Sequence, residues 1–343
     1  YQEQCNGNIV LMQSIDKFGR NHDYLRISLT DKCNLNCSYC NPALPARTLS
    51  KEEILNYEEL LRLIKIFVVN LSYKKVRLTG GEPLVRKNIL TFFAALHKVK
   101  SEFPFELCLT TNGTLLEDKI EKLKEFGLDK INISLDSLRP ERFFSITGKD
   151  NFHSVLRSID KAESLGFSPV KINTVVMKGI NDDEVIDFIE FAKDRNLNVR
   201  FIEFMPFSNN SWNENFFISN GELIKTIETK YRLEELDSCR EKVAKDFRII
   251  GHKGKVSFIS SISDHFCQSC NRLRVTANGN LKLCLFSRLD SELSLISLLR
   301  NPLFSDEAIA SRIVIHLQNK KYIHPDINEL ISLQNNNMMS IGG

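Results

Sequence analysis

Residues 25–40 read LRISLTDKCNLNCSYC, an alternating strand-like segment followed at once by three closely spaced cysteines. Leu25, Ile27 and Leu29 are apolar, whereas the two residues between them are polar. Side chains of a strand point alternately to its two faces, so one face can be buried while the other stays polar. The stretch therefore predicts a half-polar strand that ends at a cysteine-bearing loop.

The same alternation recurs further along the chain, in residues 76–79, 105–111, 130–135, 170–176 and 199–204. Amphipathic helical patterns lie between most of these strands, over residues 50–70, 88–100, 117–126, 153–165 and 182–195. The first of them is expected to begin at Ser50, which forms a capping-box pattern with Glu53. Strands that alternate with helices indicate βα units and a parallel sheet.

Polar residues on one face of every strand favour a curved sheet, with helices outside and a polar cavity inside, over a flat doubly wound sheet. The alternative is that these charges lie at strand ends and reach out to water. In a parallel βα barrel, binding sites collect at the carboxyl ends of the strands. We therefore expect an α/β fold with a ligand cavity on the inner face.

After about residue 235 the pattern changes from βα units to hairpins. Residues 247–250 and 255–259 are joined by a glycine-containing turn, and residues 273–277 and 281–286 by Asn278-Gly279-Asn280, which contains the strong Asn-Gly hairpin signal. A short helical stretch follows at residues 291–299. A chain of 343 residues is long enough for about two domains. We expect them to be residues 1–235 and a smaller α+β domain, residues 236–343.

Charge and hydropathy indicate which classes of binding partner are excluded. Lys and Arg number 46 against 43 Asp and Glu, a formal net charge of +3. Nucleic-acid-coating surfaces and polybasic membrane anchors need dense like charge, so we expect neither nucleic acid nor membrane as a partner. No apolar run approaches the roughly 18–20 residues of a membrane span. The chain starts at Tyr1 rather than Met, which is compatible with a trimmed N-terminus.

Six of the nine cysteines form two triplets, which are Cys33, Cys37 and Cys40, and Cys267, Cys270 and Cys284. Cys5, Cys108 and Cys239 are scattered and have no assigned role. Disulfide frameworks belong to small secreted chains, whereas clustered thiols in a larger protein indicate metal ligands in a reducing compartment.

The first triplet offers three local ligands, whereas structural zinc sites usually take two ligand pairs and a cubane iron–sulfur cluster takes four protein ligands. Three cysteines would leave one iron open to a small molecule. With this spacing, and with Thr79-Gly80-Gly81-Glu82-Pro83 just after the second strand, the chain resembles the radical S-adenosylmethionine (SAM) enzymes. The resemblance implies a 4Fe–4S cluster on the first triplet, whose open iron binds SAM and whose electron cleaves it to a 5′-deoxyadenosyl radical.

For the second triplet, zinc and iron–sulfur stay equally open on spacing alone, because His265 could complete a Cys3His site. From residue 18 to residue 343 the chain is similar to the GTP 3′,8-cyclase family of molybdenum cofactor biosynthesis, most of all to its eukaryotic form. The similarity rests on residues 24–30, 77–83, 110–113, 131–136, 199–206, 263–274 and 341–343. It implies an incomplete (βα)6 barrel of the TIM type, and a second 4Fe–4S cluster that binds the guanine of GTP.

A phosphate site can be inferred from the residues themselves. Arg272 and Arg274 lie two apart on a strand, hence on one face, and arginine is the preferred bidentate phosphate ligand. For any one arginine, the alternative is a solvated or salt-bridged surface charge. Strands of the polar face carry four more cations, which are Arg26, Arg77, Lys171 and Arg200.

The family resemblance also implies ligand contacts for single residues. The expected GTP contacts are Arg26, Arg77, Thr110, Lys171, Arg272 and Arg274. The expected SAM contacts are Tyr39, Gly81, Ser134 and Met205. No side chain is expected to be catalytic beyond holding the cofactors and the radical. Gly342 and Gly343 are expected to form a tail that enters the active site.

The same resemblance implies the reaction and its surroundings. The radical would take a hydrogen from C3′ of GTP, and the new carbon radical would attack guanine C8. Reduction and protonation would then give (8S)-3′,8-cyclo-7,8-dihydroguanosine 5′-triphosphate. Implied partners are a reductant protein, a downstream cyclic pyranopterin monophosphate synthase and a second copy of the chain in a homodimer. The expected compartment is the mitochondrial matrix for a eukaryotic chain and otherwise the cytoplasm.

Two alternatives remain open at this point, a radical SAM enzyme that modifies a peptide and a zinc-stabilised binding module. The chain also departs from the family pattern at two places. Residues 41–49 form a shorter segment than is usual, and Asn335-Asn336-Asn337 replaces a basic residue before the tail. These departures put local interactions in doubt, but not the cysteine ligands.

Overall fold

The computed structural model describes residues 12–40, 48–207, 210, 212–236, 243–287, 291–332 and 338–342. Its strands are β1 (Tyr24–Ser28), β2 (Lys75–Thr79), β3 (Glu106–Thr111), β4 (Lys130–Ser134), β5 (Val170–Val176), β6 (Leu197–Glu203), β7 (Leu233–Glu235), β8 (Lys245–Ile249), β9 (Lys255–Ile259), β10 (Arg272–Val275), β11 (Asn280–Lys282) and β12 (Leu293–Ser294). Its α-helices are α1 (Tyr57–Lys65), α2 (Ile89–Glu102), α3 (Ile120–Glu125), α4 (Pro140–Thr147), α5 (Phe152–Ser164), α6 (Val185–Ala192), α7 (Asn220–Glu228), α8 (Leu295–Arg300), α9 (Asp306–Leu317), α10 (Ile327–Ser332) and α11 (Met338–Ile341).

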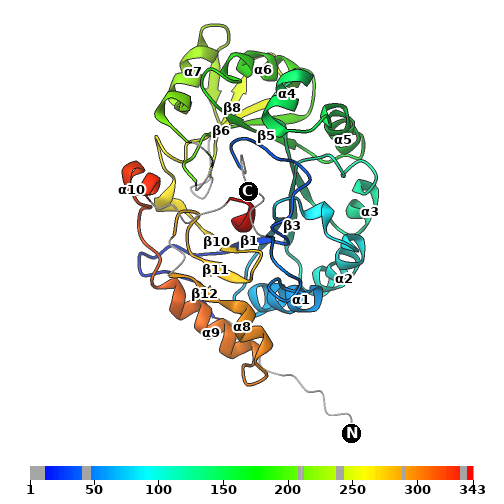
Figure 1. Ribbon diagram of the computed structural model, residues 1–343, viewed down its shortest axis with the longest axis vertical. Coiled ribbons are helices and arrows are strands. Elements are labelled where there is room, and N and C mark those ends of the chain that lie inside the picture. Colours follow the sequence, from blue (N-terminus) through cyan, green and yellow to red (C-terminus); the bar gives the residue numbers. More distant parts are fainter. Residues whose placement is uncertain are drawn as a thin grey trace.

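Strands β1 to β6 pair in sequence order, and each neighbouring pair is parallel. The sheet curves into an open ring, and α1 to α6 lie on its outside (Figure 1). A parallel sheet of consecutive βα units is the arrangement that the alternating pattern predicted. The predicted partial barrel is therefore confirmed.

The two faces of the sheet have different chemistry. On β4, Ile131 and Ile133 are fully buried in the same apolar cluster as Leu123 of α3 and Val155 of α5. The alternate residues of the strands face the inside of the ring, where they line the cavities described below. The apolar outer face holds the helices against the sheet, and this leaves the inner face free for a ligand.

The C-terminal hairpins join this same sheet at both of its edges. β10 pairs in parallel with β1, and β9 pairs in parallel with β6. The β8–β9 and β10–β11 pairs are antiparallel, which confirms both predicted hairpins. Gly279, in the turn of the second hairpin, has a φ of +74°, a conformation that favours glycine. The division into domains at residue 235 stays a prediction.

Helix α1 begins later than expected. The predicted start was Ser50, but the helix begins at Tyr57, after an N-cap at Asn56. The Asn56 side chain accepts a hydrogen bond from the backbone N–H of Glu59, and the Glu59 carboxylate accepts one from Asn56, so this second capping box is complete. At Ser50 the backbone N–H donates to the Glu53 carboxylate at 2.9 Å, but residues 51–53 form a turn rather than a helix. None of the described helices is both long and apolar enough to cross a membrane.

Glu203, the last residue of β6, fastens the barrel to the loop that leads into the second triplet. Its buried carboxylate accepts hydrogen bonds from the backbone N–H groups of Asn220 (3.1 Å), Ile262 (2.8 Å) and Ser263 (3.0 Å). It also accepts one from the Ser263 hydroxyl. The Glu203 carboxylate therefore fixes these segments in place, because each buried N–H donor would lose its hydrogen-bond partner, at a cost in folding free energy, if the carboxylate moved.

Replacement of Glu203 by Gln should therefore destabilise the protein. The amide of Gln must turn an NH2 group towards one of the N–H donors, and a buried donor left unpaired costs about 1–3 kcal/mol. The matched control is Glu234→Gln, which removes an exposed ion pair with Arg248 and should change stability little. Urea unfolding measures both variants, and equal midpoints for the two would contradict the anchoring role.

Candidate active site

The first cysteine triplet lines one cavity on the inner face of the barrel. Cys33, Cys37 and Cys40 come from the loop after β1, and the cavity has a volume of about 1040 Å³ including its mouth. The Sγ atom of Cys33 accepts hydrogen bonds from the backbone N–H of Leu35 (3.4 Å) and from Nδ2 of Asn112 (3.8 Å). Three thiols from one loop, facing one cavity, are a donor set that fits an iron–sulfur cluster.

The protein alone keeps these thiols protonated. Burial raises the pKa of Cys40 to about 12, and burial together with the charge of Asp136 holds the pKa of Cys37 well above its usual value. A coordinated metal deprotonates a thiol outright. The thiols of the first triplet would therefore become thiolates only when a metal group binds to them.

The four expected SAM residues line the same cavity as the first triplet. Tyr39 donates its hydroxyl hydrogen to Oδ2 of Asp136 at 2.8 Å, and this hydrogen bond fixes the tyrosine ring at the cavity wall. A Cβ atom at Gly81 would lie 2.4 Å from the carbonyl oxygen of Lys32, so only glycine fits there. Ser134 and Met205 complete the set. Their contacts with SAM stay predictions, but the fold brings all four together.

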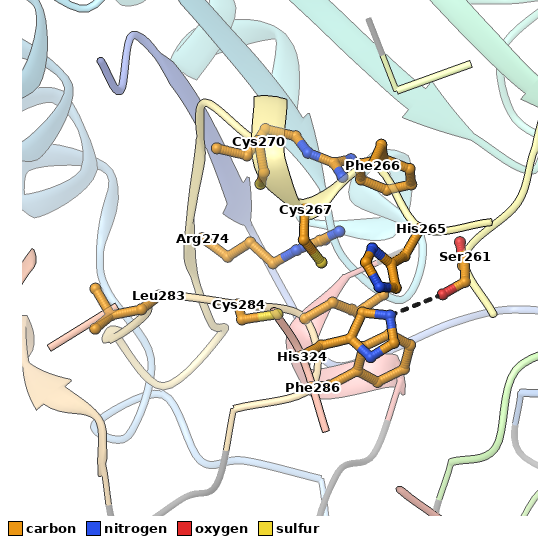
Figure 2. A pocket seen from close by; sticks show the side chains of 12 residues that line it. Ser261, His265, Phe266, Cys267, Cys270, Arg274, Leu283, Cys284, Phe286 and His324 are labelled. Atoms are coloured by element: carbon orange, nitrogen blue, oxygen red, sulfur yellow. Dashed lines mark hydrogen bonds between the residues drawn. The ribbon is translucent and has the colours of Figure 1, made fainter. Parts of the chain in front are cut away.

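The second triplet lines a separate cavity of about 470 Å³. Figure 2 shows Cys267, Cys270 and Cys284 around the side chain of Arg274, with the rings of His265 and other residues nearby. Arg272 lines this cavity too, and its guanidinium lies 4.8 Å from the ring centre of Phe266.

Positive charge surrounds the second triplet, in contrast to the first. Burial alone would raise the pKa of Cys270, but the positive charges of Lys320 and Arg272 lower it to about 6. The Nζ atom of Lys320 lies 3.7 Å from the sulfur of Cys270. This thiol is therefore mostly ionised at neutral pH, before any metal binds.

Neither triplet is arranged around a single point. Within the part of the chain that the structure describes, no three His, Cys, Asp or Glu side chains are placed to hold one metal ion. A cubane cluster binds each thiolate through a different iron, so its ligands do not meet at one centre. Iron and labile sulfide analysis, rather than ligand geometry, separates a cluster from the Cys3His zinc alternative.

Three of the expected GTP residues stand side by side on neighbouring strands. Arg26 of β1 pairs in register with Arg77 of β2 on one side and with Arg274 of β10 on the other. Arg77 donates from Nε to the hydroxyl oxygen of Tyr24 at 2.6 Å and from Nη1 to Oγ1 of Thr110 at 3.2 Å. Thr110 also lines the first cavity, so the arginine row reaches the cavity of the first triplet.

Two further cations lie on the opposite side of the ring. Burial, and then the charge of Arg200, lower the pKa of Lys171 to about 8. Arg200 of β6 lies 3.5 Å from the side-chain oxygen of Asn173. Burial would raise the pKa of Tyr24, but the charges of Arg77 and Arg26 lower it to about 8. The inner face therefore concentrates positive charge that the net charge of +3 does not reveal.

The C-terminal segment folds back into this site. Helix α11, coloured red, lies inside the ring in Figure 1, and Met338 and Met339 line the first cavity. The carbonyl oxygen of Gly342 accepts a hydrogen bond from Nη1 of Arg274 at 3.2 Å. A Cβ atom at Gly342 would lie 2.7 Å from the side chain of Thr79. Gly342 thus enters the active site as expected.

Some of the expectations fall on parts of the chain that are not described. Gly343, Cys5, Cys239 and Asn335–Asn337 lie outside the described residues, as does most of the segment after Cys40. Cys108 is described and is fully buried on β3.

Sequence reasoning did not single out Tyr24, Asp136 or Lys320. Tyr24 and Asp136 lie at the two ends of predicted strands within stretches of family similarity, so their position could have identified them. Lys320 lies 50 residues from Cys270, and no spacing signal joins the two. Only the folded chain brings that lysine to the second triplet.

Comparison with known proteins agrees with this geometry. Residues 27–192 match the family model described as the radical SAM superfamily, and residues 197–325 match the one described as Molybdenum Cofactor Synthesis C. The mitochondrial GTP 3′,8-cyclase of Arabidopsis thaliana is 44% identical, over 99% of this chain and 86% of that protein. The GTP 3′,8-cyclase of Listeria monocytogenes is 43% identical, over 84% of this chain and 86% of that protein.

The chain belongs to the GTP 3′,8-cyclase family, within the radical SAM superfamily. The resemblance inferred from the two triplets is confirmed, and the chain is a radical SAM enzyme that uses SAM and an iron–sulfur cluster. Molybdenum cofactor biosynthesis protein 1 of the mouse is 44% identical over 95% of this chain, which spans only 51% of that protein.

Solved structures support the fold alone. The structure of Streptococcus suis SuiB with bound S-adenosylmethionine matches 85% of this chain and 68% of that protein, with a TM-score of 0.58 and 13% sequence identity. At this identity the match supports the barrel architecture, and the assignment to the GTP 3′,8-cyclase family rests on the sequence relatives.

Replacement of Gly81 by Ala should disturb the SAM cavity of this radical SAM enzyme. Its Cβ would press on the backbone of Lys32, which cannot yield as a flexible side chain would. Overpacking of this kind costs about 1–3 kcal/mol. We expect a lower free energy of unfolding and weaker SAM binding in equilibrium dialysis.

The matched control is Gly221→Ala in the first turn of α7. The added Cβ there would meet only Oγ of Ser219, at 3.8 Å, and alanine is favoured in a helix. This variant should bind SAM normally and be as stable as the wild type or more so. A Gly81→Ala protein that behaves like this control would show that the close approach has no effect.

Proposed function

We propose that this chain is itself a GTP 3′,8-cyclase, which converts GTP to (8S)-3′,8-cyclo-7,8-dihydroguanosine 5′-triphosphate in the first step of molybdenum cofactor biosynthesis. The observation that carries the proposal is the row of Arg274, Arg26 and Arg77 on three adjacent strands. This row joins the cavity of one cysteine triplet to that of the other, because Arg274 lines the second cavity and Arg77 bonds to Thr110 at the first.

The arginine row favours an anionic ligand of high charge. Burial, followed by the charge of Arg274, holds the pKa of Arg26 well below its usual value. The charged form of such a row is costly when it is buried without a counter-charge. A triphosphate supplies several negative charges, and guanidinium groups bind phosphate oxygens bidentately. We assign the GTP contacts to Arg26, Arg77, Thr110, Lys171, Arg272 and Arg274.

The chain's own residues hold the reactants and exclude water. When bound, the first cluster and SAM supply the 5′-deoxyadenosyl radical that removes the hydrogen from C3′ of GTP. Tyr39, Gly81, Ser134 and Met205 would place SAM in the first cavity, beside Thr110. The second triplet would hold a second 4Fe–4S cluster, against which guanine rests while the arginines bind the phosphates. The two cavities then orient one ligand each, so that the ribose lies between them.

We also propose partners for the reaction and a compartment for the enzyme. An external one-electron reductant protein serves the chain, and a cyclic pyranopterin monophosphate synthase consumes the product. The enzyme acts as a homodimer. One relative is named as mitochondrial, which supports the mitochondrial matrix for a eukaryotic chain; a bacterial chain would act in the cytoplasm.

Anaerobic incubation with SAM, GTP and dithionite tests the function. We expect a cyclised nucleotide, detected by mass spectrometry, together with 5′-deoxyadenosine in equal amount. The double variant Arg272→Ala/Arg274→Ala should bind GTP at least tenfold more weakly, which is the loss of about 1.4 kcal/mol, and should still cleave SAM. SAM cleavage without a cyclised product in the wild type would overturn the proposal, and unchanged GTP affinity in the variant would overturn the phosphate assignment.

GTP affinity should fall as the pH rises through 8. Below this pH Lys171 is cationic and Tyr24 is neutral; above it Lys171 is neutral and Tyr24 is anionic, so the cavity loses positive charge twice. Because the bound nucleotide raises both pKa values, proton linkage predicts about a tenfold weaker affinity at pH 8.5 than at pH 7.

The double variant Lys171→Arg/Tyr24→Phe isolates these two groups. Arginine stays charged and phenylalanine cannot ionise, so the affinity of this variant should be nearly flat after the titration of GTP itself is subtracted. Isothermal titration calorimetry without SAM or reductant measures both proteins. The same pH profile in both would show that other groups control binding.

A further inference from the structure

Lys320 is a buried cation at the back of the second cysteine triplet. It follows α9, and its side chain contacts the loop that carries Cys270. The Nζ atom donates to the carbonyl oxygen of Arg272 at 2.7 Å and to the sulfur of Cys270 at 3.7 Å. The residue is 3% exposed, so water does not screen its charge.

The described residues offer Lys320 no carboxylate as a partner. Among them, no Asp or Glu forms an ion pair with this lysine. Asp16 of the adjoining N-terminal turn is already bonded to Nε of Arg20 (2.6 Å) and to Nε2 of His22 (3.1 Å). A buried ammonium group without a counter-charge is costly, so a negative group in contact with Lys320 would stabilise its charged form. The Cys270 thiolate is the negative group in contact with it.

The segment around Lys320 is also held rigidly against the cysteine loop. Arg20 donates from Nη1 to the carbonyl oxygens of Cys267 (2.8 Å) and Tyr322 (3.0 Å), and from Nη2 to that of Lys321 (2.9 Å). The cation and the thiol are therefore fixed relative to one another by the backbone on both sides. A fixed charge costs no reorganisation when the charge of its neighbour changes.

We infer that Lys320 is a positioning residue that sets the reduction potential of the group on the second triplet. Uptake of one electron adds a negative charge beside Cys270, and a fixed positive charge together with an N–H···S hydrogen bond favours that reduced form. Lys320 therefore makes the second cluster easier to reduce than its burial alone would allow. The inference rests on the second cluster proposed above.

The test is a potentiometric titration of the anaerobically reconstituted full chain, with dithionite as the electron donor and EPR as the readout. Lys320→Met removes the charge and keeps the length of the side chain. We expect the ratio of reduced to oxidised second cluster to fall about tenfold at the wild-type midpoint, a shift of about 59 mV to more negative potential for a one-electron couple. Repeating the titration with Cys37→Ala added removes the signal of the first cluster.

Two variants control for a purely structural effect. Lys320→Arg keeps the charge and should titrate close to the wild type. Lys321→Met removes the same charge from the next residue, which is exposed, and solvent screening should leave the midpoint unchanged. If Lys320→Met fails to assemble, Lys320→Gln keeps a donor for the Arg272 carbonyl and should show the same shift.

The outcomes are separable. A wild-type midpoint in the Met or Gln variant, at full iron and labile sulfide content, would overturn the role of Lys320 and leave the proposed function intact. Zinc without labile sulfide on the second triplet of the wild type would overturn the second cluster and this inference with it. A shifted midpoint in Lys321→Met as large as that in Lys320→Met would show a general charge effect and overturn the specific one.

Discussion

Backbone pairing forces three arginines to stand beside one another inside the barrel. Arg274, Arg26 and Arg77 are register partners on adjacent strands, which neighbouring parallel strands hold about 4.7–4.9 Å apart. A slip of one residue would move each side chain to the opposite, apolar face, so the register cannot relax the repulsion. The concentration of positive charge is therefore a consequence of strand pairing, and it makes the inner face a suitable place for an anionic ligand.

The same strand pairing places C-terminal residues inside the barrel sheet. Arg274 belongs to β10, which lies beside β1 although the two strands are far apart in the sequence. At the other edge β9 pairs with β6, so both exposed edges of the parallel sheet are covered by C-terminal strands. Open sheet edges invite unwanted pairing, and covering them serves stability. Because Arg272 is the register partner of Tyr24, the same pairing brings the second triplet to the end of the barrel at which β1 begins.

The sequence predicted much of this fold because its signals were local. The strand over residues 170–176 has the predicted bounds, and both hairpins form as their turns indicated. The predicted start of α1 was wrong because two capping patterns lie six residues apart, and the helix begins after the one at Asn56. The six cysteines were found by spacing. The bond between Lys320 and Cys270 was not, because contacts between distant segments carry no periodic signal.

The two triplets differ in the sign of the charges around them. Near the first lie Asp136 and the buried Glu82, which oppose the charge on its thiols. Near the second lie Lys320, Arg272 and Arg274, which favour negative charge. Positive charge around the second triplet suits the polyanion that we propose as substrate, because the same cations would stabilise both the thiolates and the phosphates.

Arg274 connects this charge distribution to the end of the chain. Its guanidinium already donates to the carbonyl oxygen of Gly342. Arginine has five N–H donors in a fixed fork, so it can hold the tail with one edge and a phosphate with the other. With the GTP contacts proposed above, the tail would therefore help to orient a phosphate rather than compete with it. A Cβ atom at residue 342 would lie 2.7 Å from the side chain of Thr79, so the close packing of the tail favours glycine at this position.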